Sequence, residues 1–188
     1  INKMLEPLNK NFRGLVLISG PTKSGKSKLA EFLIKDQDCI TYIATSKPRN
    51  NDNDWLNRIA IHRKRRPNSW NLIEHPHDIC SEIELIGKKE SILLDSLGGL
   101  VEQYLMENDH KWKIFQRVFV KCITQNNYCI IVVSEEIGWG LVPSTPIGHL
   151  FRERLSKLSS LISRYSTRKW LAINGTAIDL DSIGNQIP

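Results

Sequence analysis

The fold is decided by the stretch Gly14-Leu15-Val16-Leu17-Ile18-Ser19, followed directly by Gly20-Pro21-Thr22-Lys23-Ser24-Gly25-Lys26-Ser27. The first part is a short apolar run, typical of a buried parallel strand. The second part matches G-x-x-x-x-G-K-[ST], in which successive backbone N–H groups form an anion-binding nest at the start of a helix. Glycines permit the backbone angles that such a loop needs. The stretch therefore predicts a phosphate-binding loop (P-loop) between a strand and a helix over 26–35.

Two side chains of this loop have specific predicted roles. Lys26 can reach the β- and γ-phosphates of a nucleoside triphosphate, and the Ser27 hydroxyl can ligate Mg²⁺. We expect all eight residues to contact the nucleotide: Gly20, Pro21, Thr22, Lys23, Ser24, Gly25, Lys26 and Ser27.

Strand and helix patterns alternate along the rest of the chain. Apolar runs predict strands over 39–44, 70–74, 91–95, 128–134 and 169–173. Helical patterns cover 55–65, 78–86, 100–106, 113–124 and 148–165, and the tail after Gly175 gives no clear prediction. This order predicts an α/β fold, a mostly parallel sheet with helices on both faces in the RecA-like P-loop architecture. We expect a single domain over 1–188 with an N-terminal extension over 1–13.

The overall composition is that of a globular protein and not of a membrane protein. The 188 residues carry a net charge of +6. No run of about 18 apolar residues is present, and residues 1–13 lack the apolar core of a signal peptide. The four cysteines form no C-x-x-C pair. We expect a cytoplasmic location and no membrane contact.

Asp95 closes the apolar strand Ser91-Ile92-Leu93-Leu94-Asp95. A carboxylate at that place in a P-loop protein holds Mg²⁺, directly or through water. The alternative is a residue that caps the following turn. Asp95-Ser96-Leu97-Gly98 also matches the D-x-x-G of regulatory GTPases, but no N-K-x-D guanine-reading motif accompanies it.

His62 precedes the densest basic run, Arg63-Lys64-Arg65-Arg66. A neutral imidazole is a nucleophile toward phosphorus, and neighbouring cations favour the neutral ring and attract phosphates. The alternative is a surface histidine on a solvated basic helix.

Taken together, these residues resemble a family, the adenosylcobinamide kinase/adenosylcobinamide-phosphate guanylyltransferases. The similarity spans about Gly14 to Ile173. Beyond the P-loop it rests on Tyr42-Ile43-Ala44-Thr45, on Arg58-Ile59 with His62, Arg66-Pro67 and Trp70, on Leu94-Asp95-Ser96-Leu97, on Val133 to Pro143, and on Phe151-Arg152-Glu153.

The resemblance implies two reactions of coenzyme B12 assembly. In the first, adenosylcobinamide is phosphorylated with GTP or ATP. In the second, GMP passes from GTP to adenosylcobinamide phosphate through a histidine–GMP intermediate, giving adenosylcobinamide-GDP and pyrophosphate. His62 matches the family's nucleophile. The resemblance also implies a homo-oligomer, specifically a trimer.

Three further residues are candidates for the site. Glu136 lies in the loop after the 128–134 strand, where it could bind nucleotide, position Mg²⁺ or cap the loop. Glu74 follows a strand and could accept hydrogen bonds from a guanine edge. Arg66 is a candidate for binding substrate or for shaping its loop.

Two other functions remain open from the residues. A simple P-loop small-molecule kinase would use Lys26, Ser27 and Asp95, with His62 as a bystander. A nucleic-acid-binding NTPase would use the Arg63–Arg66 run on phosphates. The second is disfavoured because no aromatic residues interleave that run and no nucleic-acid module is recognisable, so we expect no nucleic-acid partner.

Overall fold

The computed structural model describes residues 4–48, 52–87, 90–125, 127–140, 142–185 and 187, without the side chains of residues 54, 55 and 58. The strands are β1 (Gly14–Gly20), β2 (Ile40–Ala44), β3 (Asn71–Glu74), β4 (Ser91–Asp95), β5 (Cys129–Glu135), β6 (Arg168–Ile173) and β7 (Thr176–Asp179). The helices are α1 (Lys26–Ile34), α2 (Asn53–Arg65), α3 (Ile79–Leu85), α4 (Leu97–Gln103), α5 (Asp109–Thr124), α6 (Pro146–Tyr165) and α7 (Leu180–Ile183).

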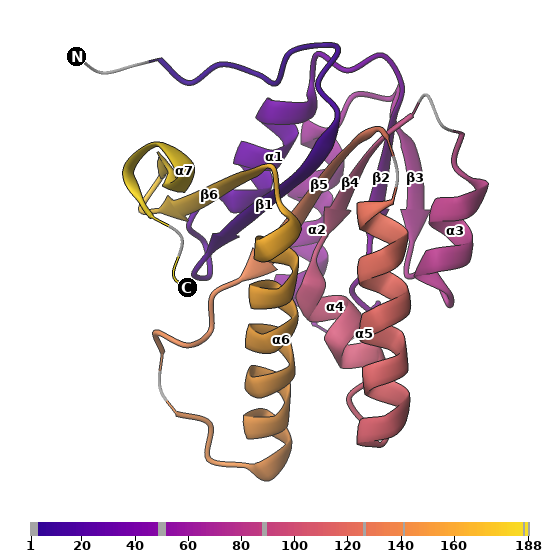
Figure 1. The fold of residues 1–188 in the computed structure, drawn as a ribbon, viewed down its shortest axis with the longest axis vertical. Coiled ribbons are helices and arrows are strands. Elements are labelled where there is room, and N and C mark those ends of the chain that lie inside the picture. The colour runs from indigo at the N-terminus through magenta and orange to yellow at the C-terminus, as the bar shows by residue number, and fades with distance from the viewer. Residues whose placement is uncertain are drawn as a thin grey trace.

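The strands form one seven-stranded sheet in the order β3-β2-β4-β5-β1-β6-β7. Every pairing from β3 to β6 is parallel, and β7 is antiparallel to β6. Figure 1 shows helices on both sides of this sheet. The predicted α/β class with a mostly parallel sheet is confirmed.

Each face of the sheet has its own apolar cluster. On one face, Leu29, Ala30, Leu33 and Ile34 of α1 pack against alternate residues of the central strands. On the other face, α3, α4, α5 and α6 cover the remaining strand residues around the fully buried Phe119. Because the inner strands are covered on both faces, they read as continuous apolar runs in the sequence.

The largest differences from the sequence prediction concern three elements. α4 begins at Leu97 and ends at Gln103, earlier than expected. α5 begins at Asp109 because the side chain of Asn108 caps it, accepting a hydrogen bond from the backbone N–H of Lys111. β7 was missing from the prediction, and the left-handed pair Asn174-Gly175 forms the turn that joins it to β6.

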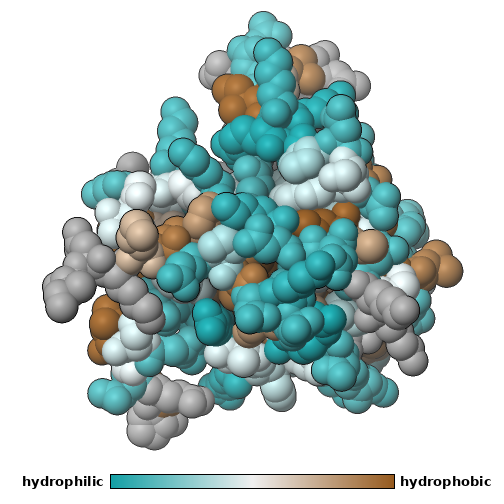
Figure 2. Space-filling view, turned by 90° about the horizontal axis from the view of Figure 1, so that it is seen from above, coloured by the Kyte–Doolittle hydropathy of each residue, from teal (hydrophilic) through white to brown (hydrophobic). Residues whose placement is uncertain are grey.

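The two ends of the strands differ in character. The strands β1, β2, β4 and β5 end at Gly20, Ala44, Asp95 and Glu135. These residues therefore lie at the carboxyl end of the sheet, to which the arrowheads point in Figure 1. Figure 2 views the other end from above, where hydrophilic residues predominate and apolar ones are scattered among them. In open parallel sheets, ligands bind at the carboxyl ends of the strands.

Among the described residues, no helix combines the length and apolarity that crossing a membrane requires.

Candidate active site

The Gly20–Ser27 loop has the backbone of an anion cradle. It leaves β1 at Gly20 and enters α1 at Lys26. Gly25 is left-handed (φ 98°) at the N-cap of α1, and Lys23 is also left-handed (φ 59°). These turns let backbone N–H groups face one point beside the positive end of the helix dipole.

Neighbouring strands hold the cradle tightly. A Cβ added to Gly20 would lie 2.2 Å from the Ala172 carbonyl oxygen of β6. The backbone N–H of Glu136 donates to the Gly20 carbonyl at 2.8 Å, and that of Gly175 donates to the Ser24 carbonyl at 3.2 Å. The loop is therefore fixed from both adjacent strands.

Polar side chains of the cradle are suited to an anion. The Lys26 ammonium donates to the Pro21 carbonyl at 3.0 Å, so it folds over its own loop. The Ser24 hydroxyl oxygen is buried and has no hydrogen-bond partner in the part of the chain that the structure describes. Ser27, the second residue of α1, is half-buried. Phosphate oxygens would give Ser24 the partner that a buried hydroxyl requires.

His62 and Asp95 meet at the same end of the sheet as the cradle. His62 Nδ1 lies 3.9 Å from Asp95 Oδ2, and their side chains are only 19% and 13% exposed. The separation suits an ion pair and is too long for a hydrogen bond. The same Asp95 oxygen accepts a hydrogen bond of 2.6 Å from the Tyr42 hydroxyl. His62 is thus half-buried against a carboxylate and does not lie on an open basic surface.

Arg66 contacts both the backbone of His62 and the ring of Tyr42. Arg66 Nε donates to the backbone carbonyl of His62 at 3.1 Å, and its guanidinium lies 4.1 Å from the centre of the Tyr42 ring. Burial, followed by the charge of Asp95, raises the pKa of the Tyr42 hydroxyl well above its usual value. Tyr42 therefore keeps its proton and remains a donor to Asp95 at neutral pH.

An ion pair joins the His62 helix to the cradle helix. Arg65 donates from Nε and Nη2 to the two carboxylate oxygens of Glu31 on α1, each at 3.0 Å. Burial raises the pKa of Glu31, and the hydrogen bonds from Arg65 oppose that shift. Arg63 is also paired, so at least three of the four residues in the basic run contact other groups of the chain.

Glu135 is an organising residue that the sequence did not single out. It accepts hydrogen bonds from the Ser96 hydroxyl and, at 3.0 Å, from the Gly98 backbone N–H. A cis peptide joins Asp95 to Ser96, and Thr45 hydrogen-bonds to both backbone groups of Ser96. Glu135 thereby ties β5 to the turn that follows Asp95. Only its place at a strand end, beside Glu136, could have indicated it.

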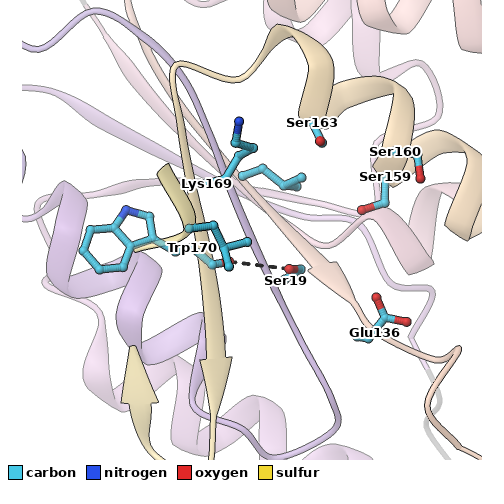
Figure 3. Close-up of a pocket in the computed structure, with 9 residues that line it drawn as sticks. Ser19, Glu136, Ser159, Ser160, Ser163, Lys169 and Trp170 are labelled. Atoms are coloured by element: carbon cyan, nitrogen blue, oxygen red, sulfur yellow. Dashed lines mark hydrogen bonds between the residues drawn. The ribbon is translucent and has the colours of Figure 1, made fainter. Parts of the chain in front are cut away.

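Glu136 faces a different cleft. Figure 3 shows it on the side of the strands that carries Ser159, Ser160 and Ser163 of α6. Its Oε1 accepts from the Gly138 backbone N–H at 2.9 Å, the contact of a residue that caps its own loop. The His62 group lies with α1 on the opposite face. The structure therefore brings Glu136 next to Gly20 but not next to His62.

Glu74 is two strands away from Asp95, and Ala44 of β2 is in register with both. Glu74 ends the edge strand β3, is half-exposed, and pairs with Arg63 at 3.2 Å. Its proposed contact with guanine remains a prediction.

A parallel sheet with this cradle at the end of β1, and with a carboxylate at the end of β4 two strands away, defines a P-loop nucleotide-binding protein. Comparison with family models is more specific. Residues 16–180 match the family described as cobinamide kinase / cobinamide phosphate guanyltransferase. The chain belongs to this family of transferases.

Curated relatives agree with this assignment. The chain is 25% identical over 181 residues to the bifunctional adenosylcobalamin biosynthesis protein CobU of Escherichia coli, covering 88% of this chain and 99% of that one. It is 29% identical over 167 residues to the bifunctional protein CobP of Pseudomonas aeruginosa, covering 87% and 95%. A solved structure from Pyrococcus horikoshii, designated PH0250, has a TM-score of 0.56 at 10% identity, covering 95% and 94%, and shows a similar fold.

Proposed function

We propose that this chain phosphorylates adenosylcobinamide and then transfers GMP from GTP to the product, giving adenosylcobinamide-GDP and pyrophosphate. The observation that carries the proposal is His62, held half-buried at Asp95 on the edge of the sheet that also bears the cradle. A P-loop alone would suit any kinase, whereas a nucleophile beside it suits nucleotidyl transfer through a covalent intermediate.

The kinase step uses the cradle. Backbone N–H groups of Gly20–Ser27 hold the triphosphate, and Lys26 exchanges its bond to Pro21 for one to the β- and γ-phosphates. The corrinoid hydroxyl attacks the γ-phosphorus, the bond to the bridging oxygen breaks, and the nucleoside diphosphate leaves. Preorganised donors favour this step because they stabilise charge on the departing oxygen.

The guanylyl transfer uses His62. Nδ1 is the ring nitrogen that faces Asp95, so we assign the attack to Nε2. A nitrogen–phosphorus bond forms at the α-phosphorus as the bond to pyrophosphate breaks. A phosphate oxygen of adenosylcobinamide phosphate then attacks the same phosphorus and releases His62. Asp95 faces the Nδ1 side of the ring, where its negative charge favours positive charge on the imidazole, and Tyr42 fixes the carboxylate by donating its hydroxyl hydrogen bond.

Magnesium fits the donor set of this site. Mg²⁺ is bound through one or two carboxylates, hydroxyls and substrate phosphates, and not in an all-protein cage. Ser27 and Asp95 would hold the ion, which when bound neutralises charge on the phosphate oxygens.

The remaining site residues act in support. Arg66 positions the His62 backbone through its Nε contact. Glu136 shapes the loop beside Gly20 by capping Gly138. A homotrimer and a cytoplasmic location are further parts of the proposal, the first checked by sedimentation and the second consistent with the supply of nucleoside triphosphates there.

Product analysis tests the proposal. Wild-type protein incubated with adenosylcobinamide, ATP, GTP and Mg²⁺ should form adenosylcobinamide phosphate, then adenosylcobinamide-GDP with one pyrophosphate per GMP transferred, as measured by mass spectrometry. Formation of the phosphate alone would support the simple-kinase alternative. Nucleotide hydrolysis with no change in the corrinoid would contradict both steps.

A further inference from the structure

A second cleft lies between α6 and the strands β1 and β6, on the face of the sheet opposite α1 (Figure 3). The side chains that decide its chemistry are Ser159 and Ser163 of α6, Glu136 from the loop after β5, and Lys169 of β6. They come from three separate segments of the chain, so the fold, and not a local motif, brings them together.

The cleft begins where the phosphate cradle begins. Ser19, which lines the cleft, directly precedes Gly20, and the backbone N–H of Glu136 donates to the Gly20 carbonyl at 2.8 Å. In the proposed kinase step, the corrinoid hydroxyl must reach a γ-phosphorus held in this cradle. Adenosylcobinamide carries that hydroxyl on one side chain of its ring and carboxamides on others. A second side chain of the same ring can therefore enter a cleft beside the cradle.

The size of the cleft suits a side chain and not the ring. Its volume is about 180 Å³. Pockets that enclose a drug-sized ligand measure roughly 300–1,000 Å³, so the macrocycle stays outside. Leu17 and Leu180 supply an apolar wall against which the methylene groups of a side chain can pack.

The polar groups of the cleft are available to a ligand. The hydroxyls of Ser159 and Ser163 form no hydrogen bond with any residue that the structure describes, although both side chains are half-buried. By contrast, Ser166 at the end of the same helix donates to the Ile162 carbonyl. Oε1 of Glu136 accepts a hydrogen bond from its own loop, which leaves Oε2 to accept from a ligand.

The charges of the cleft favour a neutral amide over an anion. Lys169 is paired with Asp181 at 2.7 Å, so its positive charge is already balanced. Figure 3 shows Glu136 and Ser159 towards the other end, where the carboxylate adds a negative charge. A carboxamide offers N–H donors to a carboxylate and a carbonyl acceptor to a hydroxyl, which matches this pair.

We propose that this cleft binds a carboxamide side chain of the corrinoid, with Glu136 accepting from the amide N–H groups and Ser159 donating to the amide carbonyl. The inference rests on the corrinoid substrate proposed above and adds the residues that hold it. It gives Glu136 a contact with substrate in addition to its hydrogen bond to Gly138.

Equilibrium binding of adenosylcobinamide, measured by calorimetry, tests the cleft without any phosphoryl transfer. Ser159→Ala should weaken binding by about two- to tenfold, the scale of one hydrogen bond, and Ser159→Leu, which fills the cleft, by about tenfold or more. Binding of ATP should be unchanged in both variants. The matched control is Lys157→Leu, which places a leucine at an exposed position of α6 outside the cleft and should bind the corrinoid like the wild type.

A corrinoid whose carboxamides have been hydrolysed to carboxylates tests the chemistry of recognition. The wild type should bind it more weakly than adenosylcobinamide, because a carboxylate in the cleft would be repelled by Glu136. Glu136→Gln removes that charge and keeps an acceptor for the Gly138 N–H, so it should reduce the preference for the amide form. An unchanged preference in this variant would contradict the contact with Glu136.

Two further results would overturn the inference alone. One is equal binding of adenosylcobinamide by the wild type and Ser159→Leu, with circular dichroism showing that the variant is folded. The other is a loss of ATP binding in Ser159→Leu as large as the loss of corrinoid binding, which would assign the cleft to the nucleotide. Failure of the proposed reactions alone would look different, because corrinoid binding would depend on Ser159 while no phosphate was transferred. A wild type that bound no adenosylcobinamide would overturn both.

Discussion

The phosphate cradle and the His62 site lie on one edge of the sheet, yet the chain builds them in different ways. The cradle is a continuous run of eight residues whose shape comes from local backbone angles, such as the φ of 98° at Gly25. The His62 site is assembled from α2, β2, β4 and α1, through Asp95, Tyr42 and the Arg65–Glu31 pair. The cradle motif is common to many nucleotide-binding proteins, whereas the His62 site depends on contacts between elements far apart in the sequence.

The largest expected effect comes from replacing Lys26 of the cradle. Lys26→Ala should slow both phosphorylation and guanylyl transfer by at least about 10²-fold, because both use the cradle and a preorganised donor is worth that much. Lys28→Ala removes an exposed lysine from the first turn of α1 and should leave both rates unchanged. The two rates are measured separately, with labelled ATP and labelled GTP. A Lys26→Ala variant that kept either reaction at the wild-type rate would show that the two reactions do not share the cradle.

Gly20→Ala tests how tightly the cradle is held. The added Cβ would meet the Ala172 carbonyl at 2.2 Å and the Ser24 hydroxyl at 2.8 Å. Forcing atoms into a packed site typically costs about 1–3 kcal/mol of unfolding free energy, which urea denaturation measures. The matched control is Gly140→Ala, whose Cβ would meet nothing closer than 3.9 Å. Equal stability of the two variants would mean that β6 does not clamp the loop.

Arg65→Ala tests the link between the regions. Loss of the bidentate contact to the nearly buried Glu31 should cost about 1–2 kcal/mol, between the values for exposed and buried pairs. It should also slow guanylyl transfer more than phosphorylation, since α2 carries His62. Lys10→Ala, in a pair whose side chains are 62% and 67% exposed, should have no measurable effect on stability. An Arg65→Ala variant as stable as the wild type would show that the pair does not hold α2.

The smallest effect concerns Tyr42. Tyr42→Phe should cost about 1 kcal/mol by removing the hydrogen bond to Asp95. Because the folded pKa of Tyr42 is raised, its contribution to stability is complete below about pH 10 and is lost as the pH rises through the folded value. Unfolding curves from pH 7 to 11 should therefore show a smaller alkaline loss for this variant than for the wild type. An identical alkaline loss in both proteins would contradict the raised pKa.

The two regions also differ in how far the sequence predicted them. The cradle and its flanking strand and helix were predicted because a contiguous motif fixes them. Asp95 and His62 were singled out from their local surroundings, but their 3.9 Å contact depends on β2 lying next to β4, an order that the chain does not display. The roles of Tyr42, Glu31 and Glu135 escaped notice for the same reason, since each depends on a partner far away in the sequence. The β6–β7 hairpin was missed because a single Asn-Gly pair near the end of the chain was its main local signal.

Transfer of label from GTP to His62 is the most direct test of the central claim, that this site is a covalent nucleotidyltransferase. With GTP labelled at the α-phosphate, the wild type should acquire a protein-bound label that is lost in acid and kept in alkali, as expected of a phosphoramidate. GTP labelled at the γ-phosphate should leave no label. His149→Ala, a variant at an exposed histidine of α6, should label like the wild type, and His62→Ala should take up none. The account would be contradicted by a wild type that acquires no label, or by a His62→Ala variant that labels equally well.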